Sequence, residues 1–317
     1  MYPLSFQPII KHRIWGGTKL ESVLGKTLST TEAGESWELS SVPNDVSVVS
    51  NGVFKGNTLT DVIQQHPNEI LGRVAVQRYG ETFPLLFKFI DAKEDLSIQL
   101  HPNDDLAKAR HNSLGKTEMW YVMQADKNAR LIIGFKEESN QTEYLNHLEN
   151  DTLVDVLDEI PVEKGDVFFI ETGTIHAIGA GVVLAEIQQT SDITYRLYDW
   201  GRVDASGNGR ELHTSLALDA INFKTTKSKV SYDAMADTAS ELVKCPFFTT
   251  SILTLTSTFN WSRKQDAFTV FMCTEGTFSI KVEEVEYNYK KGDTFLIPAS
   301  ILSFECVGNA TLLEISI

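Results

Sequence analysis

Four polar residues on short, separated apolar runs have the side-chain types of a divalent metal site. Gln99 and His101 stand two positions apart, so on a β-strand both side chains leave the same face. Glu118 begins the next apolar run, and His176 follows the run 167–170 after a Glu-Thr-Gly-Thr turn. Two imidazoles, a carboxylate and an amide oxygen form a ligand set without sulfur, for which Zn²⁺ is the leading candidate.

Each of these side chains also has an ordinary structural explanation. A single His or Gln on a strand usually faces solvent or hydrogen-bonds to a neighbouring strand. Their joint placement favours the metal site, because only His101 and His176 stand where an apolar run meets a Gly or Pro turn. We interpret the other five histidines as structural or solvated: His12, His66, His111, His147 and His213.

Short β-like runs predict the elements that must position these residues. Gly, Asn, Asp and Pro separate apolar stretches that are rich in β-branched residues, as is typical of an all-β sandwich or barrel. The predicted strands are 36–40, 46–49, 85–90, 96–100 and 130–134. Helices are predicted at 58–71, with Thr58 or Thr60 at the N-cap, at 104–111, at 141–157 and in a short stretch after Arg210.

An internal repeat predicts two β-domains. The segment 163–170 resembles 290–297, and their Gly-Asp turns lie 127 residues apart. A polar, lysine-containing stretch at 224–229 suggests the boundary between the two copies. We expect a catalytic domain with the metal site at 1–225 and a degenerate domain at 226–317, although strands can cross this boundary.

The second copy of the repeat has no metal ligands. The repeat offset places Ser303 where His176 stands in the first copy, and a looser match places Phe268 opposite Glu118. The Gly-Asp turn of the second copy is explained by backbone needs alone, since Gly supplies positive φ and Asp satisfies local amides.

Composition limits the partners. The 317-residue chain carries a net charge of −15, which argues against a nucleic-acid partner. No run of apolar residues is long enough to span a membrane, and no targeting segment is visible. The three cysteines, Cys245, Cys273 and Cys306, are odd in number and are expected to be thiols in a reducing compartment. We therefore expect a soluble, cytoplasmic protein, and its oligomeric state stays open.

Longer motifs around the candidate ligands resemble one known family. A Gly-Asp turn followed by a histidine, with an earlier histidine and glutamate, resembles the cupin superfamily. Taken together, the motifs resemble the short form of type I mannose-6-phosphate isomerases. They are Gln99-Leu100-His101-Pro102-Asn103-Asp104, Gly115-Lys116-Thr117-Glu118-Met119-Trp120-Tyr121, Gly173-Thr174-Ile175-His176-Ala177, the segment 191–202, Trp15-Gly16-Gly17 and Gly34-Glu35-Ser36-Trp37-Glu38.

The resemblance implies a fold and an activity. The fold would be all-β, with two cupin-type jelly-roll β-barrel domains and a few short helices. The activity would be the zinc-dependent interconversion of mannose 6-phosphate and fructose 6-phosphate, with one Zn²⁺ per chain. By motif match, Gln99, His101, Glu118 and His176 are similar to the family's metal ligands, and Arg196 to its active-site arginine. The chain has no room for the helical domain of longer members, which leaves the walls of the cleft undefined.

Several charged residues are candidates for the chemistry itself. Aldose–ketose exchange passes through an enediolate, whose charge a divalent cation stabilises. Arg196 is suited to hold the phosphate or the enediolate bidentately, and the alternative is a surface cation. Proton transfer has three unranked candidates: Lys88, Lys116 and Asp192.

Other roles stay open at this point. Lys88 either points into the cavity, where burial and the metal would lower its pKa, or lies on the outer face of its strand. Glu35 and Glu38 either line the site or lie at its edge, and Asp199 with Arg202 is expected to be a structural pair. Two other functions also fit a cupin: a sugar-binding protein without turnover, and an iron-dependent oxygenase.

Overall fold

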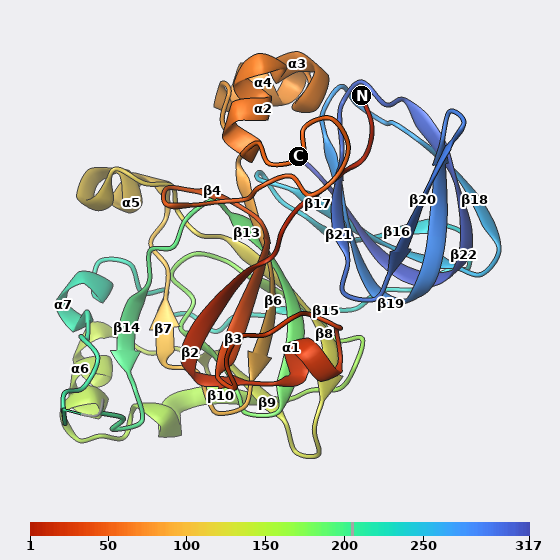
Figure 1. The fold of residues 1–317 in the computed structure, drawn as a ribbon. Helices are drawn as coiled ribbons and strands as arrows, with labels where there is room; N and C mark the ends of the chain where they lie inside the picture. The colour runs from red at the N-terminus through yellow and green to blue at the C-terminus, as the bar shows by residue number, and fades with distance from the viewer. Residues whose placement is uncertain (204–205) are drawn as a thin grey trace.

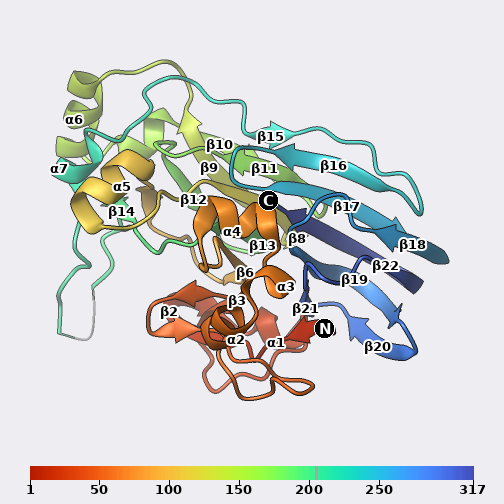
Figure 2. The ribbon, with the colours of Figure 1, turned by 90° about the horizontal axis from the view of Figure 1, so that it is seen from above.

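Strands form most of the regular structure of the protein. The computed structural model describes residues 1–203 and 206–317. Two sheets at the N-terminal end of the chain stand beside one large C-terminal sheet (Figure 1), and the view from above shows the short helices at the side and between them (Figure 2). Within the described ranges, no helix has the length and apolar character needed to cross a membrane. The expectation of a mostly β protein is therefore confirmed.

A seven-stranded sheet has the order β15-β11-β8-β13-β6-β2-β3. The central strands of this sheet are buried on both faces, and successive side chains point to opposite faces. On β6, Phe87 and Phe89 belong to the core shared with the C-terminal sheet, while Lys88 and Ile90 face the other side. The strands are β2 (Ile9–Gly17), β3 (Ala33–Leu39), β6 (Leu85–Ala92), β8 (Glu118–Ala125), β11 (Val167–Ile170), β13 (Val182–Gln189) and β15 (Lys229–Val230).

A five-stranded sheet packs against the face of β6 that carries Lys88, with the order β10-β9-β12-β7-β14. Its outer face is covered by α6 (Gln141–Glu149) and α7 (Thr214–Ala217). The strands are β7 (Ile98–Leu100), β9 (Arg130–Phe135), β10 (Leu157–Pro161), β12 (His176–Ile178) and β14 (Tyr195–Tyr198). The candidate ligands lie between this sheet and the seven-stranded one.

The C-terminal sheet has eight strands in the described residues and encloses its own apolar core. Its two long strands, β19 and β22, pair with each other over most of their length. The strands are β1 (Leu4–Ser5), β16 (Ala239–Lys244), β17 (Thr249–Leu255), β18 (Thr258–Ser262), β19 (Thr269–Val282), β20 (Val285–Lys290), β21 (Thr294–Ile297) and β22 (Ser303–Ser316).

Two strands cross between the parts of the chain. The N-terminal β1 pairs with β21 in the C-terminal sheet, and β15, at 229–230, pairs with β11 in the seven-stranded sheet. One apolar cluster includes residues of both parts, with the rings of Phe83 and Phe268 centred 4.8 Å apart. A boundary near residue 225 stays a proposal, and any such boundary separates segments that share a core.

Strand register corrects one sequence-based match. Ile170 of the first copy pairs with Glu118, and its counterpart Ile297, 127 residues later, pairs with Thr269. Thr269, not Phe268, therefore stands in the position of Glu118. The looser match was wrong by one residue, because apolar side chains on both faces of a buried strand hide its alternation.

The helices are close to those predicted. The segment 58–71 forms α2 (Leu59–Gln65) and α3 (Pro67–Ile70), because Pro67 interrupts the first helix and begins the second. Thr58, not Thr60, is the N-cap, and it forms a capping box with Asp61. The other predicted helices appear as α5 (Asp104–His111), α6 followed by a 3₁₀ turn (Leu153–Val156), and α7.

Two helices were not predicted, and one predicted strand was too long. The sequence analysis did not predict α1 (Lys19–Ser22) or α4 (Arg73–Tyr79). Of the predicted strand 46–49, only its start lies in a strand, β5 (Asp45–Val46), which pairs with β4 (Ser41–Val42). The rest forms isolated bridges.

Candidate metal centre

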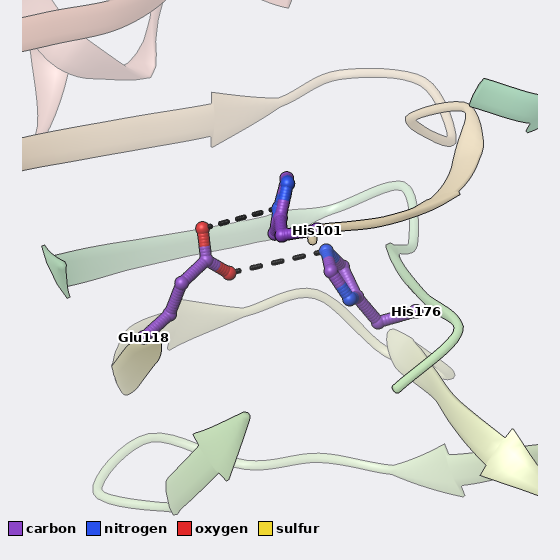
Figure 3. Close-up of side chains that lie close together, drawn as sticks. All are labelled: His101, Glu118 and His176. Carbon is purple, nitrogen blue, oxygen red and sulfur yellow. Dashed lines mark ion pairs between the residues drawn. The ribbon is translucent and has the colours of Figure 1, made fainter. Parts of the chain in front are cut away.

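Three candidate ligands converge from separate strands. Glu118 begins β8, His176 begins β12, and His101 follows the end of β7 (Figure 3). Nε2 of His101 lies 3.3 Å from Oε1 of Glu118, and Nε2 of His176 lies 3.9 Å from Oε2. The possible ligand atoms all lie within 4.8 Å of one another, and the three side chains are almost fully buried.

Backbone carbonyls fix both imidazole rings. Nδ1 of His101 lies 2.8 Å from the carbonyl oxygen of Ile193, and Nδ1 of His176 lies 2.9 Å from that of Thr174. A carbonyl only accepts, so each Nδ1 donates and each Nε2 keeps a lone pair directed at Glu118. Second partners of this kind orient histidines that bind metals.

Two buried atoms of this cluster have no hydrogen-bond partner in the described parts of the chain. They are Nε2 of His176 and Oε2 of Glu118, and both are acceptors. Buried acceptors without a donor are costly, whereas a cation between them would satisfy both. The three side chains therefore fit a divalent metal.

Protonation states in the cluster also suit a metal. Burial, with the charge of Lys116, lowers the pKa of His101 to about 4, and burial lowers the pKa of His176. Burial alone would raise the pKa of Glu118, but Lys116 and His101 outweigh it and hold that pKa well below its usual range. At neutral pH the imidazoles are neutral and the carboxylate is charged, as ligands must be.

Gln99 lies next to the cluster on β7. It stands directly opposite His176 in the strand register, so both side chains project from the same face of the sheet. The Ser97 hydroxyl donates to Oε1 of Gln99 over 3.3 Å. The Gln99 side chain lines the same cavity as His176.

Lys116 is the charged residue nearest to the cluster. Its Nζ lies 2.6 Å from Oε1 of Glu118 and donates to Nε2 of His101 over 3.1 Å. The side chain is buried and lines the cavity beside the cluster. Lys116 therefore uses the same His101 lone pair that a metal would need.

A cavity of about 370 Å³ opens over these residues. This volume falls within the usual range of small-molecule sites. Its walls are rich in charge and in indole rings. The lining residues are Arg13, Trp15, Glu35, Trp37, Lys88, Ile90, Leu96, Ser97, Gln99, Lys116, Trp120, His176, Ile178, Glu186, Asp192, Thr194, Arg196 and Arg210.

Lys88 points into this cavity and is held there by carboxylates. Its Nζ lies 2.9 Å from Oε1 of Glu186, which stands opposite it on β13, and 5.3 Å from the centre of the Trp37 ring. Burial alone would lower the pKa of Lys88, but Glu186 and Glu35 raise it above its ordinary value. From the protein groups alone, this direction is opposite to the lowering expected with a metal nearby, because β13 and β3 place two carboxylates beside the amine.

Arg196 lies on β14 at the cavity wall. Its Nε is 3.3 Å from the Ser97 hydroxyl, and one terminal nitrogen donates to the carbonyl oxygen of Glu211 over 2.9 Å. The other terminal nitrogen has no protein partner among the described residues. Asp192 is exposed at the cavity rim and forms no ion pair with Arg196. Arg196 thus keeps donors for a ligand.

The remaining sequence candidates divide into two groups. Glu35 lines the cavity and pairs with Arg13 at 2.9 Å, whereas Glu38 lies outside it and pairs with Lys26 at 2.7 Å. Asp199 pairs with Arg202 as expected, at 2.5 Å, and also with Arg210.

Sequence analysis missed Glu186, which links two walls of the cavity. Its second oxygen accepts from the Trp120 indole over 2.9 Å, and the Trp120 ring meets His176 edge-on with ring centres 5.4 Å apart. The available signal was a single carboxylate within the apolar run 182–187, since unpaired charge is rarely buried.

Comparisons with known proteins agree along the whole chain. The family model "Phosphomannose isomerase type I, catalytic domain" matches residues 4–133, and "Mannose-6-phosphate isomerase, cupin domain" matches residues 238–317. The mannose-6-phosphate isomerase ManA of Bacillus subtilis is 36% identical over 97% of this chain and 96% of its own length. The mannose-6-phosphate isomerase of Streptococcus mutans is 34% identical over 98% of this chain and 97% of its own.

Solved structures show the same fold. The crystal structure of mannose 6-phosphate isomerase from Bacillus subtilis superposes with a TM-score of 0.92 at 32% identity and covers 100% of both chains. A putative mannosephosphate isomerase from Archaeoglobus fulgidus gives a TM-score of 0.79 at 22% identity, covering 99% of this chain and 98% of its own.

Proposed function

Because the chain belongs to the type I mannose-6-phosphate isomerase family, we propose that it interconverts mannose 6-phosphate and fructose 6-phosphate in the cavity beside His101, Glu118 and His176. One observation carries this proposal: His101, Glu118 and His176 bring their possible ligand atoms within 4.8 Å of one another beside a cavity lined by cations, and Nε2 of His176 and Oε2 of Glu118 have no partner among the described residues. The net charge of −15 makes such local cations necessary for an anionic sugar phosphate.

We propose that the metal is one Zn²⁺ held by Gln99, His101, Glu118 and His176. The donor set of two nitrogens and two oxygens without sulfur suits zinc. Zinc bound there would polarise the sugar's C1 and C2 oxygens and stabilise negative charge on them. With His101 holding the metal through Nε2, Lys116 would no longer donate to that nitrogen, and its Nζ would be available to the substrate.

The isomerisation moves a proton between neighbouring carbons. Removal of the C2 proton of the open-chain aldose gives an enediolate; the C2 hydroxyl proton passes to the C1 oxygen, and return of a proton to C1 gives the ketose. Lys116 is the preferred proton carrier because its Nζ lies beside the ligand atoms; it would take the C2 proton as the neutral amine and return it to C1 as the ammonium. Asp192, at the exposed rim, is a more remote candidate. Lys88, with its raised pKa, acts as a fixed cation.

We assign the phosphate to the arginine side of the cavity. Arg196 has a terminal nitrogen without a partner in residues 1–203 and 206–317, and its guanidinium matches phosphate bidentately. Arg210 lines the same wall, although Asp199 already binds it.

We also propose a division of the molecule and a location. The parts 1–225 and 226–317 would be two cupin-type jelly rolls, the first catalytic and the second without metal ligands. The three cysteines are all free thiols, and two of them are buried. Free thiols agree with a reducing cytoplasm.

A coupled assay together with metal analysis tests this function. The purified chain should contain about one zinc and should convert mannose 6-phosphate. The His176→Ala variant should lose metal and rate together, whereas His12→Ala, an exposed histidine outside the site, should retain both. Full activity in metal-free protein would contradict the zinc proposal. Sugar-phosphate binding without proton exchange at C2 in heavy water would indicate a binding protein instead.

A further inference from the structure

The C-terminal sheet carries a second polar cleft, far from the candidate metal centre in sequence. Its volume is about 430 Å³, close to that of the first cavity. Buried polar residues form its inner part, and charged residues form its edge. The lining residues are Ala239, Glu241, Lys244, Thr249, Ser251, Trp261, Arg263, Lys264, Gln265, Thr269, Glu314 and Ser316.

Strand register shows that this cleft occupies the position of the first cavity. The strands β21-β19-β22-β17 repeat the order β11-β8-β13-β6. Glu314 stands opposite Phe271 as Glu186 stands opposite Trp120. On its other side, Glu314 stands opposite Ser251, where Glu186 stands opposite Lys88.

A buried carboxylate is retained, but its cation is not. The Trp261 indole donates to Oε1 of Glu314 over 2.7 Å, much as Trp120 donates to Glu186. Glu314 is only 8% exposed, yet it forms no ion pair with any residue that the structure describes. Since serine replaces the lysine, the second oxygen of Glu314 is left to accept from a ligand.

Two buried hydroxyls on the same face add hydrogen-bonding capacity. Ser251 lies directly across from Glu314 on β17. On β19, Phe271 stands opposite Glu314, and Thr269 lies two residues before Phe271. Ser251 and Thr269 therefore project from the same face as Glu314, into the cleft. Both side chains are buried, and neither hydroxyl has a partner in the described ranges. A ligand with several hydroxyl groups would satisfy these groups together.

The metal-ligand positions of this copy favour an anion instead of a metal. Ser262 pairs with Ser303 as Gln99 pairs with His176, but both serines are exposed and neither lines the cleft, so this copy presents no counterpart of these two candidate ligands there. Two residues after Ser262, where the first copy has His101, stands Lys264. This exposed lysine lines the cleft together with Lys244 and supplies positive charge without a metal.

We propose that this cleft is a second, non-catalytic site that binds a sugar phosphate. Glu314, Ser251 and Thr269 hydrogen-bond to the sugar hydroxyls, and Lys244 with Lys264 binds the phosphate. The site binds without turnover, because it has no metal ligands. The proposal does not depend on the isomerase activity of the first cavity.

Calorimetric titration of the full chain with D-mannitol 1-phosphate tests the proposal. This probe has the hydroxyls and phosphate of the proposed ligand but no carbonyl, so no turnover contributes heat. We expect a binding event that Lys264→Ala weakens roughly 10-fold or more, as for loss of one charged hydrogen bond. Lys281→Ala, an exposed lysine elsewhere on this sheet, should leave that event unchanged. Neither variant should change kcat/KM for mannose 6-phosphate.

A second variant tests the sugar contacts. Glu314→Gln keeps the acceptor for Trp261 but removes the charge, and we expect it to weaken the same event. If this variant does not fold, as circular dichroism would show, the Lys264→Ala result still decides. Absence of any event sensitive to Lys264→Ala overturns the proposal. Equal affinity for inorganic phosphate, or for unphosphorylated mannitol, overturns it as well, because the site would then bind only the phosphate or only the sugar hydroxyls.

Discussion

At the scale of single residues, the cavity depends on an alternating row of charges. Arg13 pairs with Glu35 and Lys88 pairs with Glu186, and Glu35 also acts on Lys88 electrostatically without forming an ion pair with it. Such buried charges are stable only when every member is paired. The row holds the amine and the carboxylates in fixed positions, ready for a polar substrate, and it makes stability depend on pH.

The first prediction concerns Glu35. Burial would raise its pKa, but Lys88, Arg13 and the Trp37 indole lower it from 4.5 to about 2. A lowered carboxylate pKa stabilises the folded state above the unfolded pKa, by about 3 kcal/mol here, and this stabilisation is lost as the pH falls through the folded pKa. The Glu35→Gln variant should lack this contribution.

Urea unfolding between pH 6 and pH 2 measures this difference. The free energy of unfolding of the wild type should fall more steeply with acid than that of Glu35→Gln. The exposed Glu149→Gln variant is the control and should follow the wild type. Parallel pH profiles for wild type and Glu35→Gln would contradict the assigned pKa.

The second prediction concerns Lys88. The Lys88→Met change leaves Glu186 buried without its cation, which should cost about 3–5 kcal/mol of stability at pH 7, whereas Glu35 keeps its ion pair with Arg13. Chemical unfolding at pH 7 measures this loss, with the exposed Lys108→Met as control. A loss no larger than that of the control would contradict the pairing of Lys88 with Glu186.

At the scale of elements, the alternation of side chains along strands and the positions of strand ends bring the residues of the site together. On β6, alternate side chains face the shared core and the cavity, so one strand contributes to both. The candidate ligands His101, Glu118 and His176 stand at strand ends, where turns bring β7, β8 and β12 together. The helices α2 and α3 lie away from this site; α2 is stabilised by its capping box, and both helices pack their apolar residues into the shared core.

The third prediction tests the start of α2. Thr58 accepts from the backbone N–H of Asp61 over 3.1 Å, and Asp61 accepts in return from the backbone of Thr58. The Thr58→Ala variant should lose about 1 kcal/mol of stability, the usual cost of an N-cap. Thr60→Ala, inside the helix, should cost nothing. Urea unfolding gives both values, and KM should stay unchanged in both variants.

At the scale of the whole molecule, the two parts share one core. Phe83 and Phe268, from opposite parts, are fully buried in a common cluster with ring centres 4.8 Å apart. The strand exchange of β1 and β15 adds backbone hydrogen bonds between the parts. The C-terminal part has an apolar core of its own, but the largest cluster is formed by both parts together, so we expect them to unfold together.

The fourth prediction follows from this shared core. Calorimetry should show one unfolding transition, and activity should be lost across the same temperature range. Phe268→Ala should cost about 3–5 kcal/mol and move both curves together, although the residue is remote from the cavity. Two separate calorimetric peaks, with activity following only one, would show that the parts are independent.

The sequence by itself determined most of the local structure and which side chains are candidates for a metal site. The spacing of Gln99 and His101, the turn before His176 and an N-cap at Thr58 or Thr60 are local features, and local geometry follows from neighbouring residues. Strand-like runs likewise predicted a mostly β chain.

Only the tertiary structure decided which distant side chains meet. Whether Lys88 faced the cavity, and that Glu186 would hold it, depends on the register between β6 and β13, which are far apart in the chain. The register also shows that the counterpart of Glu118 is Thr269 and not Phe268. Register is fixed by packing between whole sheets, and on strands buried on both faces the apolar pattern no longer reveals it.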